Sequence, residues 1–161
     1  MSPLSRNNGI DKYINTDISV ISSKIQEDYQ KYSLRGLTLS GGEPIHPFHT
    51  ESIKQLITDI RHNIKIDIMA FSGYTSLEIT QMGWVSQYID LIIAGPYIDE
   101  LKHDGGIVSS TNQGIMRFSN RFDDVSDNEL INGERIIETH ANTNGDVVIT
   151  GLIGKHELIE S

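Results

Sequence analysis

Apolar residues along the chain alternate between the spacing of a helix and the spacing of a strand. Residues 15–32 carry a stripe with helical spacing, formed by Ile18, Ile21, Ile25, Tyr29 and Tyr32. In residues 36–40, Leu37 and Leu39 stand between polar neighbours, which is the period-2 pattern of a strand. The pattern therefore predicts a helix followed by a strand.

The same alternation continues through the middle of the chain. A second helix is predicted over residues 50–62, and residues 64–71 form an apolar run typical of a strand buried on both faces. A short helix from residue 75, a helical turn over residues 84–89 and a third strand over residues 90–94 follow. Polar residues at the expected helix starts suit capping: Thr16 or Asp17, then Thr50, then the pair Thr75 and Glu78 with the spacing of a capping box.

The last third of the chain is more polar. Residues 99–113 predict a long loop, and residues 115–118 a fourth short strand. Two extended runs, residues 135–140 and 147–150, flank an Asn-Gly turn and predict a β-hairpin. Alternating helices and strands predict an α/β fold with a parallel sheet and right-handed crossovers, followed by this hairpin.

Composition narrows the classes of function. With 161 residues the chain predicts one domain, and a net charge of −9 argues against a nucleic-acid partner. No apolar run approaches the roughly 18 residues of a membrane span, and residues 1–13 lack the apolar stretch of a signal peptide, so a cytoplasmic location is expected. The chain contains no cysteine, which excludes disulfides and thiolate metal sites built from its own residues.

The stretch GLTLSGGEPIHP, residues 36–47, holds the strongest candidate chemistry. Gly41 and Gly42 end the first strand, allowing a sharp turn and a close approach of a ligand to the main chain. Glu43 follows, at the carboxyl end of the strand, where parallel α/β folds bind their ligands. A carboxylate beside bare backbone suits a positively charged amino group. The alternative is an ordinary strand-to-helix turn with a solvated glutamate.

Four blocks in this order carry a resemblance to a known family: LSGGEP, a strand ending in FSGYT, DLIIAGPYIDELKHDGG, and SSTNQ. Together they resemble the radical S-adenosylmethionine enzymes. More narrowly, residues 2–118 are similar to the small activating enzymes that include the anaerobic ribonucleotide reductase activases. The resemblance implies a partial (β/α) barrel of parallel strands over residues 1–118. Residues 119–161 would be a C-terminal extension whose hairpin packs on the same domain.

The resemblance also implies roles for individual residues. A cofactor-binding set would hold the methionine amino group of S-adenosylmethionine and lie beside the cofactor: Gly41, Gly42, Glu43, Pro44, Ser72, Gly73 and Tyr74. A second set would form the loop that meets the substrate or partner: Gly95, Pro96, Tyr97, Ser110, Thr111, Asn112 and Gln113. Ser109 stands where the family has glycine, so less freedom of the backbone is expected there. The implied partner is a glycyl-radical enzyme or another activated protein.

The chain departs from the family in one decisive respect. The family binds a [4Fe–4S] cluster through a Cys-x3-Cys-x2-Cys segment that follows a first strand, and neither the segment nor the strand is found in this sequence. The sequence begins with a stretch that resembles the one directly after the third cysteine. The histidines are expected to be surface or hydrogen-bonding residues, so the sequence predicts neither a metal site nor a catalytic residue of its own. A chain that lacks the family's amino-terminal segment and cannot catalyse the reaction is therefore expected.

Three functions follow from these observations. The first is an incomplete radical S-adenosylmethionine activating enzyme. The second is a non-catalytic module that binds S-adenosylmethionine or another nucleoside at residues 41–44. The third is a docking domain that meets a partner enzyme through residues 97–113. The strand at residues 36–40 is also expected to lack a neighbour and to expose apolar side chains, which predicts marginal stability.

Overall fold

The computed structural model describes residues 17–133, 138–141 and 147–150. Its centre is a four-stranded sheet of β1 (Gly36–Leu39), β2 (Asp67–Ser72), β3 (Leu91–Ala94) and β4 (Gly114–Arg117), in that spatial order. β1, β2 and β3 are parallel, as expected, and β4 runs antiparallel to β3. The prediction of a mixed α/β fold built mainly on parallel strands is confirmed.

The antiparallel direction of β4 is a departure from the expected all-parallel sheet. The segment between β3 and β4 contains only η3 (Asp99–Leu101), a three-residue 3-10 helix. A parallel connection needs a crossover that returns the chain to the opposite edge of the sheet, usually through a full helix. Because this segment contains no such helix, the chain enters β4 from the edge at which β3 ends.

The helices between the parallel strands arise from the predicted apolar stripes. They are α1 (Ile18–Tyr32), α2 (Thr50–Asn63), α3 (Ser76–Gln81) and α4 (Val85–Tyr88). Asp17 caps α1 by accepting from Ser19 N, and the capping box of Thr75 and Glu78 starts α3 as expected. Thr50 was expected to cap α2 but is its first residue, because η2 (Pro47–His49) continues directly into the helix.

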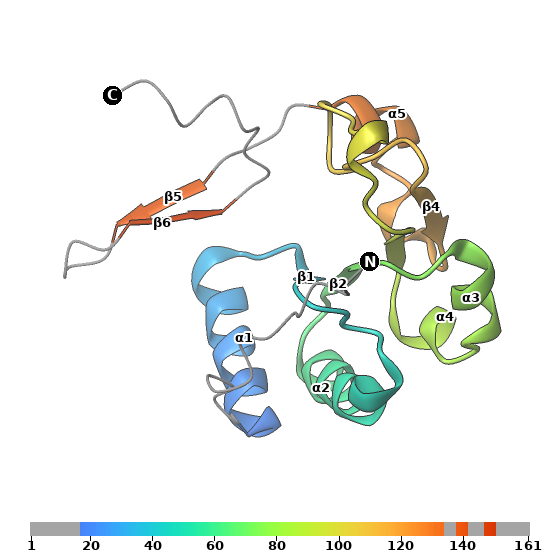
Figure 1. Ribbon diagram of the computed structural model, residues 1–161. Helices are drawn as coiled ribbons and strands as arrows, with labels where there is room; N and C mark the ends of the chain where they lie inside the picture. Colours follow the sequence, from blue (N-terminus) through green and yellow to red (C-terminus); the bar gives the residue numbers. More distant parts are fainter. Residues whose placement is uncertain (1–16, 134–137, 142–146, 151–161) are drawn as a thin grey trace, which may run out of the picture.

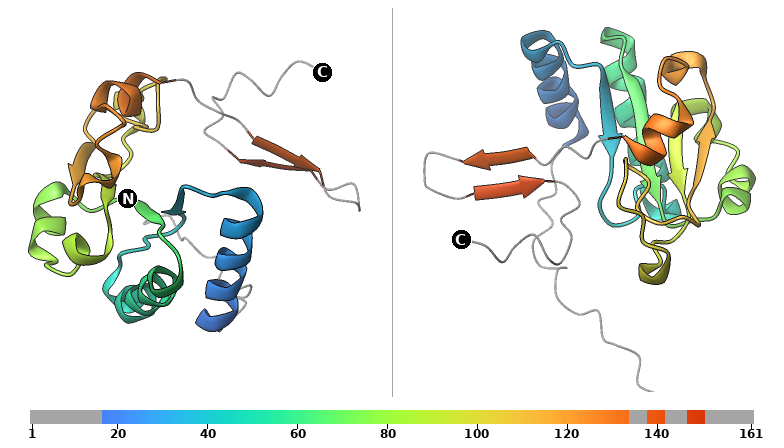
Figure 2. Two further views of the ribbon diagram at one scale, coloured as in Figure 1. Left: turned by 180° about the vertical axis from the view of Figure 1, so that it is seen from behind. Right: turned by 90° about the horizontal axis from the view of Figure 1, so that it is seen from above.

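The sheet has a core on each face. On one face, α1 and α2 lie side by side (Figure 1), and Ile57, Ile60 and Ile68 belong to the larger buried cluster there. On the other face lies α5 (Asp127–Asn132), which the sequence analysis missed (Figure 2). Its Leu130 belongs to a second buried cluster with Leu91, Ile93 and Val108, on β3 and the segment after it. β3 is buried on both faces because it lies between the two clusters.

β1 is an edge strand whose neighbour among the described strands is β2. Leu39 is buried and Leu37 is half-buried on the face covered by α1 and α2, whereas Gly36 and Thr38 are exposed. The expectation that this edge exposes apolar side chains was therefore wrong for Leu39, whereas Leu37 keeps part of its surface exposed; strand alternation directs both leucines toward the helices.

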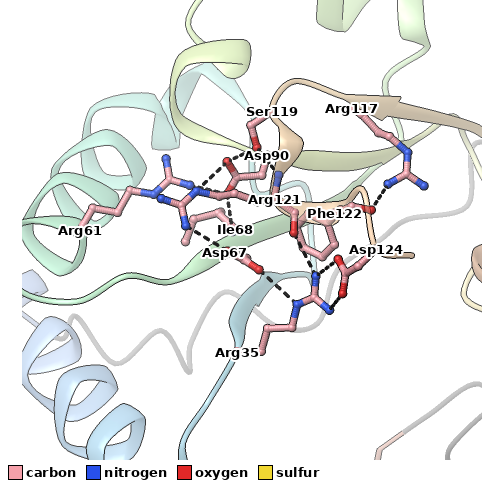
Figure 3. A network of polar contacts seen from close by, with 10 residues as sticks. All are labelled: Arg35, Arg61, Asp67, Ile68, Asp90, Arg117, Ser119, Arg121, Phe122 and Asp124. Atoms are coloured by element: carbon pink, nitrogen blue, oxygen red, sulfur yellow. Dashed lines mark hydrogen bonds and ion pairs between the residues drawn. The ribbon is translucent and has the colours of Figure 1, made fainter. Parts of the chain in front are cut away.

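A network of ion pairs joins the segment after β4 to the amino ends of the parallel strands (Figure 3). Asp90, just before β3, is 3% exposed and accepts from Ile68 N at 2.7 Å and from Ser119 Oγ at 2.8 Å. Asp90 also binds the Arg61 guanidinium, and Arg121 Nε lies 3.6 Å from its other carboxylate oxygen.

Arg35 extends this network toward the solvent. It contacts Asp67 at 3.2 Å and binds Asp124 through both terminal nitrogens at 2.6 Å. These bonds raise the pKa of Arg35, through Asp124 first, and the Arg35 guanidinium lowers the pKa of the Asp124 carboxyl. Residues 119–124 are thus tied to the sheet, although the division of the chain at residue 118 stays a prediction.

The predicted hairpin is present as β5 (Glu138–Ala141) and β6 (Val147–Thr150), which pair antiparallel with Thr139 opposite Ile149. Its expected Asn-Gly turn, residues 142–146, and the polar residues 1–13 lie outside the described residues. Among the described helices, none combines the length and the apolar character needed to cross a membrane.

Candidate functional site

The predicted site residues lie where the parallel strands end, on the turns that follow β1, β2 and β3. Parallel strands place their carboxyl ends at one edge of a sheet, so these turns are neighbours in space although they are far apart in sequence. Hydrogen bonds connect the turn after β1 to the turn after β2, and the turn after β2 to the turn after β3.

The turn after β1 is held open by two glycines. Gly41 has φ +85° and Gly42 has φ +56°, both in the left-handed region that other residues rarely adopt. Apart from the adjoining residues of the chain, no atom of residues 17–133, 138–141 and 147–150 lies within 4 Å of the position that a Cβ would occupy at either glycine, and both glycines are exposed. Ile45 is fully buried and anchors the turn after half-buried Pro44. The main chain at Gly41 and Gly42 is therefore accessible to a ligand.

Glu43 is fixed by the turn after β2. One carboxylate oxygen, Oε1, accepts from Ser72 Oγ at 2.8 Å, and the other, Oε2, accepts from Gly73 N at 2.7 Å. Ile45 N lies 3.4 Å from Oε1. A carboxylate offers about four acceptor positions, so the side chain is held in one orientation while acceptor capacity remains on Oε2.

Ser72, the last residue of β2, helps to fix the Glu43 carboxylate. Its residue is 5% exposed, and its hydroxyl, besides donating to Glu43, accepts from Tyr74 N at 3.1 Å. Both roles of the hydroxyl are therefore used inside the protein. Gly73 is exposed, and a Cβ there would lie 3.4 Å from Glu43 Oε2, which is an ordinary van der Waals contact, so the two turns lie directly against each other.

The turn after β3 continues the series of contacts. Gly95 has φ +127° and donates its N–H to the carbonyl oxygen of Ser72 at 3.0 Å. Gln113 donates from Nε2 to the carbonyl oxygen of Gly95 at 3.0 Å, and Asn112 donates from Nδ2 to that of Pro96 at 2.7 Å. The predicted partner-loop residues on both sides of η3 are thus brought together.

The segment before β4 is closed by hydrogen bonds within itself. Gln113 Oε1 accepts from Ser109 N at 2.9 Å and from Ser110 N at 3.2 Å. Ser110 is fully buried, whereas Thr111 is exposed and donates its N–H to the carbonyl oxygen of Leu101. Ser109 does not have a positive φ, so serine causes no backbone strain where the family has glycine.

The exposed side chains of this loop differ from its buried ones. Tyr97 and Leu101 are 52% and 40% exposed. The Tyr97 hydroxyl donates to Asp99 Oδ1 at 2.9 Å, and this bond raises the pKa of Tyr97. Any molecule that meets the loop from outside would contact these residues before Ser110 or Gln113.

Sequence analysis missed the role of Gly105 and Gly106. A Cβ at Gly106, which has φ +54°, would lie 2.2 Å from the carbonyl oxygen of Leu130 in α5. Gly106 N also donates to the carbonyl oxygen of Gly133 at 2.7 Å. The only signal in the sequence was the Asp-Gly-Gly motif, which by itself indicates a turn and not a position where a helix packs against the main chain.

The described residues include no group of three His, Cys, Asp or Glu side chains able to hold a metal ion. His46 Nδ1 accepts from Phe48 N at 3.1 Å, and His103 Nε2 lies 2.8 Å from the carbonyl oxygen of Ile131. These are hydrogen-bonding histidines, as expected. His49 packs edge-on against Phe48, and the side chain of His140 lies outside the description.

Comparison with known proteins finds relatives that share one name. The chain is 36% identical over 89 residues to the anaerobic ribonucleoside-triphosphate reductase-activating protein of Vibrio cholerae, covering 53% of this chain and 57% of that protein. The protein of the same name from Haemophilus influenzae is 36% identical over 88 residues, covering 52% and 56%. That of Enterobacteria phage T4 is 31% identical over 81 residues, covering 50% and 49%.

The chain thus spans about half the length of the curated relatives it matches. No solved structure matches it significantly. The family described as the 4Fe-4S single cluster domain matches residues 10–116, which include the turns after β1, β2 and β3. Because this match covers more than half of the sequence and the relatives agree with it, the chain belongs to the 4Fe-4S single cluster domain family and is homologous to the anaerobic ribonucleotide reductase-activating proteins.

Proposed function

We propose that this chain supplies the S-adenosylmethionine-binding part of an activating protein for an anaerobic ribonucleotide reductase or a similar glycyl-radical enzyme. The observation that carries the proposal is the fixed orientation of Glu43, whose carboxylate is held by Ser72 Oγ and Gly73 N beside two exposed glycines. The names of the relatives supply the class of reaction.

The turn has the chemistry to receive the methionine end of the cofactor. An ammonium group needs acceptors, and Glu43 Oε2 has capacity beyond its bond to Gly73 N. A charge-assisted hydrogen bond of this kind is stronger than a neutral one. Gly41 and Gly42 leave room for the cofactor against the main chain, and Pro44 limits the movement of the turn. In the radical enzymes that the chain resembles, S-adenosylmethionine supplies a carbon-centred radical.

The [4Fe–4S] cluster implied by the family does not fit the residues present. Cluster ligands are thiolates, and the sequence given contains no cysteine. We therefore derive no step through a cluster, and the role proposed for this chain is limited to binding the cofactor and meeting a partner.

The partner would dock on the loop that surrounds this edge of the sheet. Tyr97 and Leu101 present exposed apolar surface there, next to the acidic residues Asp99 and Glu100. Exposed aromatic and aliphatic side chains are common anchors of protein interfaces. We place the protein in the cytoplasm, where such a reductase would act.

Calorimetry with S-adenosylmethionine tests the proposal. The full chain should bind the ligand, and Glu43→Gln should weaken binding by about 10- to 100-fold, because a hydrogen bond to a charged group contributes about 1.5–3 kcal/mol. Glu27→Gln, which removes one exposed negative charge from α1, is the matched control and should bind as the original chain does.

A second ligand localises the effect. 5′-Methylthioadenosine lacks the amino acid part, so its affinity should be the same for the original chain and Glu43→Gln. No heat with millimolar S-adenosylmethionine, or an equal loss for both ligands, would count against a carboxylate–ammonium contact.

The second candidate function is a binding module without catalysis, favoured by the absence of cysteine. It shares the ligand site with the first and differs in its partner. Purification of the chain together with an anaerobic ribonucleotide reductase separates them. Ligand binding without capture of the reductase would favour the binding module, whereas ligand binding together with capture would favour the activating-protein role.

A further inference from the structure

The side chain of Gln113 has an unusual position among the predicted partner-loop residues. It makes three hydrogen bonds to main-chain groups: Oε1 accepts from Ser109 N and Ser110 N, and Nε2 donates to the carbonyl oxygen of Gly95. All polar atoms of its amide face the protein's own backbone. Gln113 is therefore suited to fix two segments relative to each other rather than to contact a partner.

Gly95, the residue to which the Gln113 amide donates, is closely packed. A Cβ at Gly95 would lie 3.3 Å from Gln113 Cα, so the two backbones are nearly in contact. Gly95 is buried and donates its N–H to the carbonyl oxygen of Ser72. Displacement of the turn after β3 would therefore disturb the end of β2, where Ser72 and Gly73 bind Glu43.

We propose that Gln113 is a positioning residue for Glu43: its side-chain amide fixes the turn after β3, and that turn fixes the end of β2 that orients the carboxylate. The series runs from Gln113 through Gly95 and Ser72 to Glu43, with distances of 3.0, 3.0 and 2.8 Å. The outer side of the same loop carries Tyr97, so a partner that moves the loop would change the orientation of Glu43.

The substitution Gln113→Glu tests the series with minimal change of shape. The new carboxylate can still accept from Ser109 N and Ser110 N, but it cannot donate to Gly95 and places an oxygen against the Gly95 carbonyl. Amide hydrogen exchange of the full chain, followed by NMR, measures the effect at the Glu43 end of the series of hydrogen bonds. The Gly73 amide, which is bound to Glu43 Oε2, should exchange about tenfold faster, while the amide of Ile92 in β3 should not change.

A matched control is available on α4. Gln87 also donates from Nε2 to a main-chain carbonyl oxygen, that of Gly83 at 3.2 Å, but it is outside the series. Gln87→Glu should leave the exchange of Gly73 unchanged. An unchanged Gly73 amide in Gln113→Glu, or an equal change in both variants, would overturn the proposal.

Ligand affinity supplies a second readout, which rests on the proposed function. Gln113→Glu should weaken S-adenosylmethionine binding by about five- to tenfold, and this loss should disappear when Glu43 is already glutamine, because positioning acts through the carboxylate. A loss of the same size in the Glu43→Gln background would overturn the positioning role.

The two readouts separate this inference from the proposed function. A faster Gly73 amide in a chain that does not bind the ligand would retain the positioning role and reject the proposed function. A chain that binds the ligand but shows an unchanged Gly73 amide would do the reverse. If Gln113→Glu does not fold, Asn112→Ala removes the exposed bond to the Pro96 carbonyl of the same turn. It should then speed exchange at Gly73 about threefold, and no change would overturn the inference.

Discussion

At the scale of single residues, the two ends of the sheet use carboxylates in opposite ways. Asp90, at the amino end of β3, is buried, and its carboxylate accepts from Arg61, Ile68 N and Ser119 Oγ. Glu43, at the carboxyl end of β1, has donors on one side and exposed main chain on the other. A fully surrounded carboxylate stabilises a fold, whereas a half-surrounded one can receive a ligand.

Removal of the buried carboxylate should be costly. Asp90→Ala leaves the Arg61 guanidinium, which is mostly buried, without its charged partner, so the free energy of unfolding should fall by about 3–5 kcal/mol. Urea denaturation followed by circular dichroism measures this loss. Asp104→Ala, which removes an exposed ion pair with Lys102, should change stability by less than about 0.5 kcal/mol. Equal effects of the two substitutions would contradict this account of Asp90.

At the scale of elements, residues 99–113, between β3 and β4, were expected to form a long polar loop. Its hydrogen bonds show a more closed arrangement: Ile107 N and Val108 N donate to the carbonyl oxygen of Leu130 in α5, and Gly106 N donates to that of Gly133, directly after the helix. Gln113 closes the other end of the loop. This loop therefore satisfies the carbonyl groups that a helix leaves without partners at its carboxyl end.

Gly106→Ala should detach α5 from this loop. The added Cβ would meet the Leu130 carbonyl oxygen at 2.2 Å and also require an alanine at φ +54°. We expect a loss of about 1–3 kcal/mol in the free energy of unfolding, together with faster hydrogen exchange in residues 127–132. Gly83→Ala is the control, because in the part of the chain that the structure describes only its own chain neighbours come within 4 Å of its Cβ position, and its φ is not positive. A stability equal to that of Gly83→Ala would show that α5 does not depend on this contact.

At the scale of the whole molecule, the described sheet is open, with β1 at one edge and β4 at the other. Among the described strands, β1 has a partner on one side only, so main-chain groups on its other side lack a strand partner, although Leu39 is buried. We expect the chain to melt below about 60 °C and to associate at high concentration, since ordinary domains melt at about 45–65 °C and this one has an open edge. Scanning calorimetry at several protein concentrations measures this. A sharp transition above about 60 °C in a monomer would contradict the expectation.

Much of the fold followed from local patterns. The stripe of Ile53, Leu56, Ile57 and Ile60 predicted α2, and the apolar run over residues 64–71 predicted a strand. β2 begins later, at Asp67, and its residues alternate between half-buried and buried, so the expectation of a strand buried on both faces was wrong for β2. The direction of β4 and the presence of α5 were not predicted. Both depend on contacts with β3 that are distant in sequence: in β4, Arg117 pairs with Leu91, and in α5, Leu130 belongs to the same buried cluster as Leu91 and Ile93.

The sequence by itself determined the order of the helices and strands from α1 to β4, the two-glycine turn with its glutamate, and the absence of thiolate ligands from the sequence given, because these depend on residue types and short spacings. Only the tertiary structure decided that Ser72 and Gly73 orient Glu43 and that Gln113 faces the backbone of Gly95 rather than a partner. Such contacts join residues that are 18 or more positions apart, and they exist only after the sheet has brought the strand ends together.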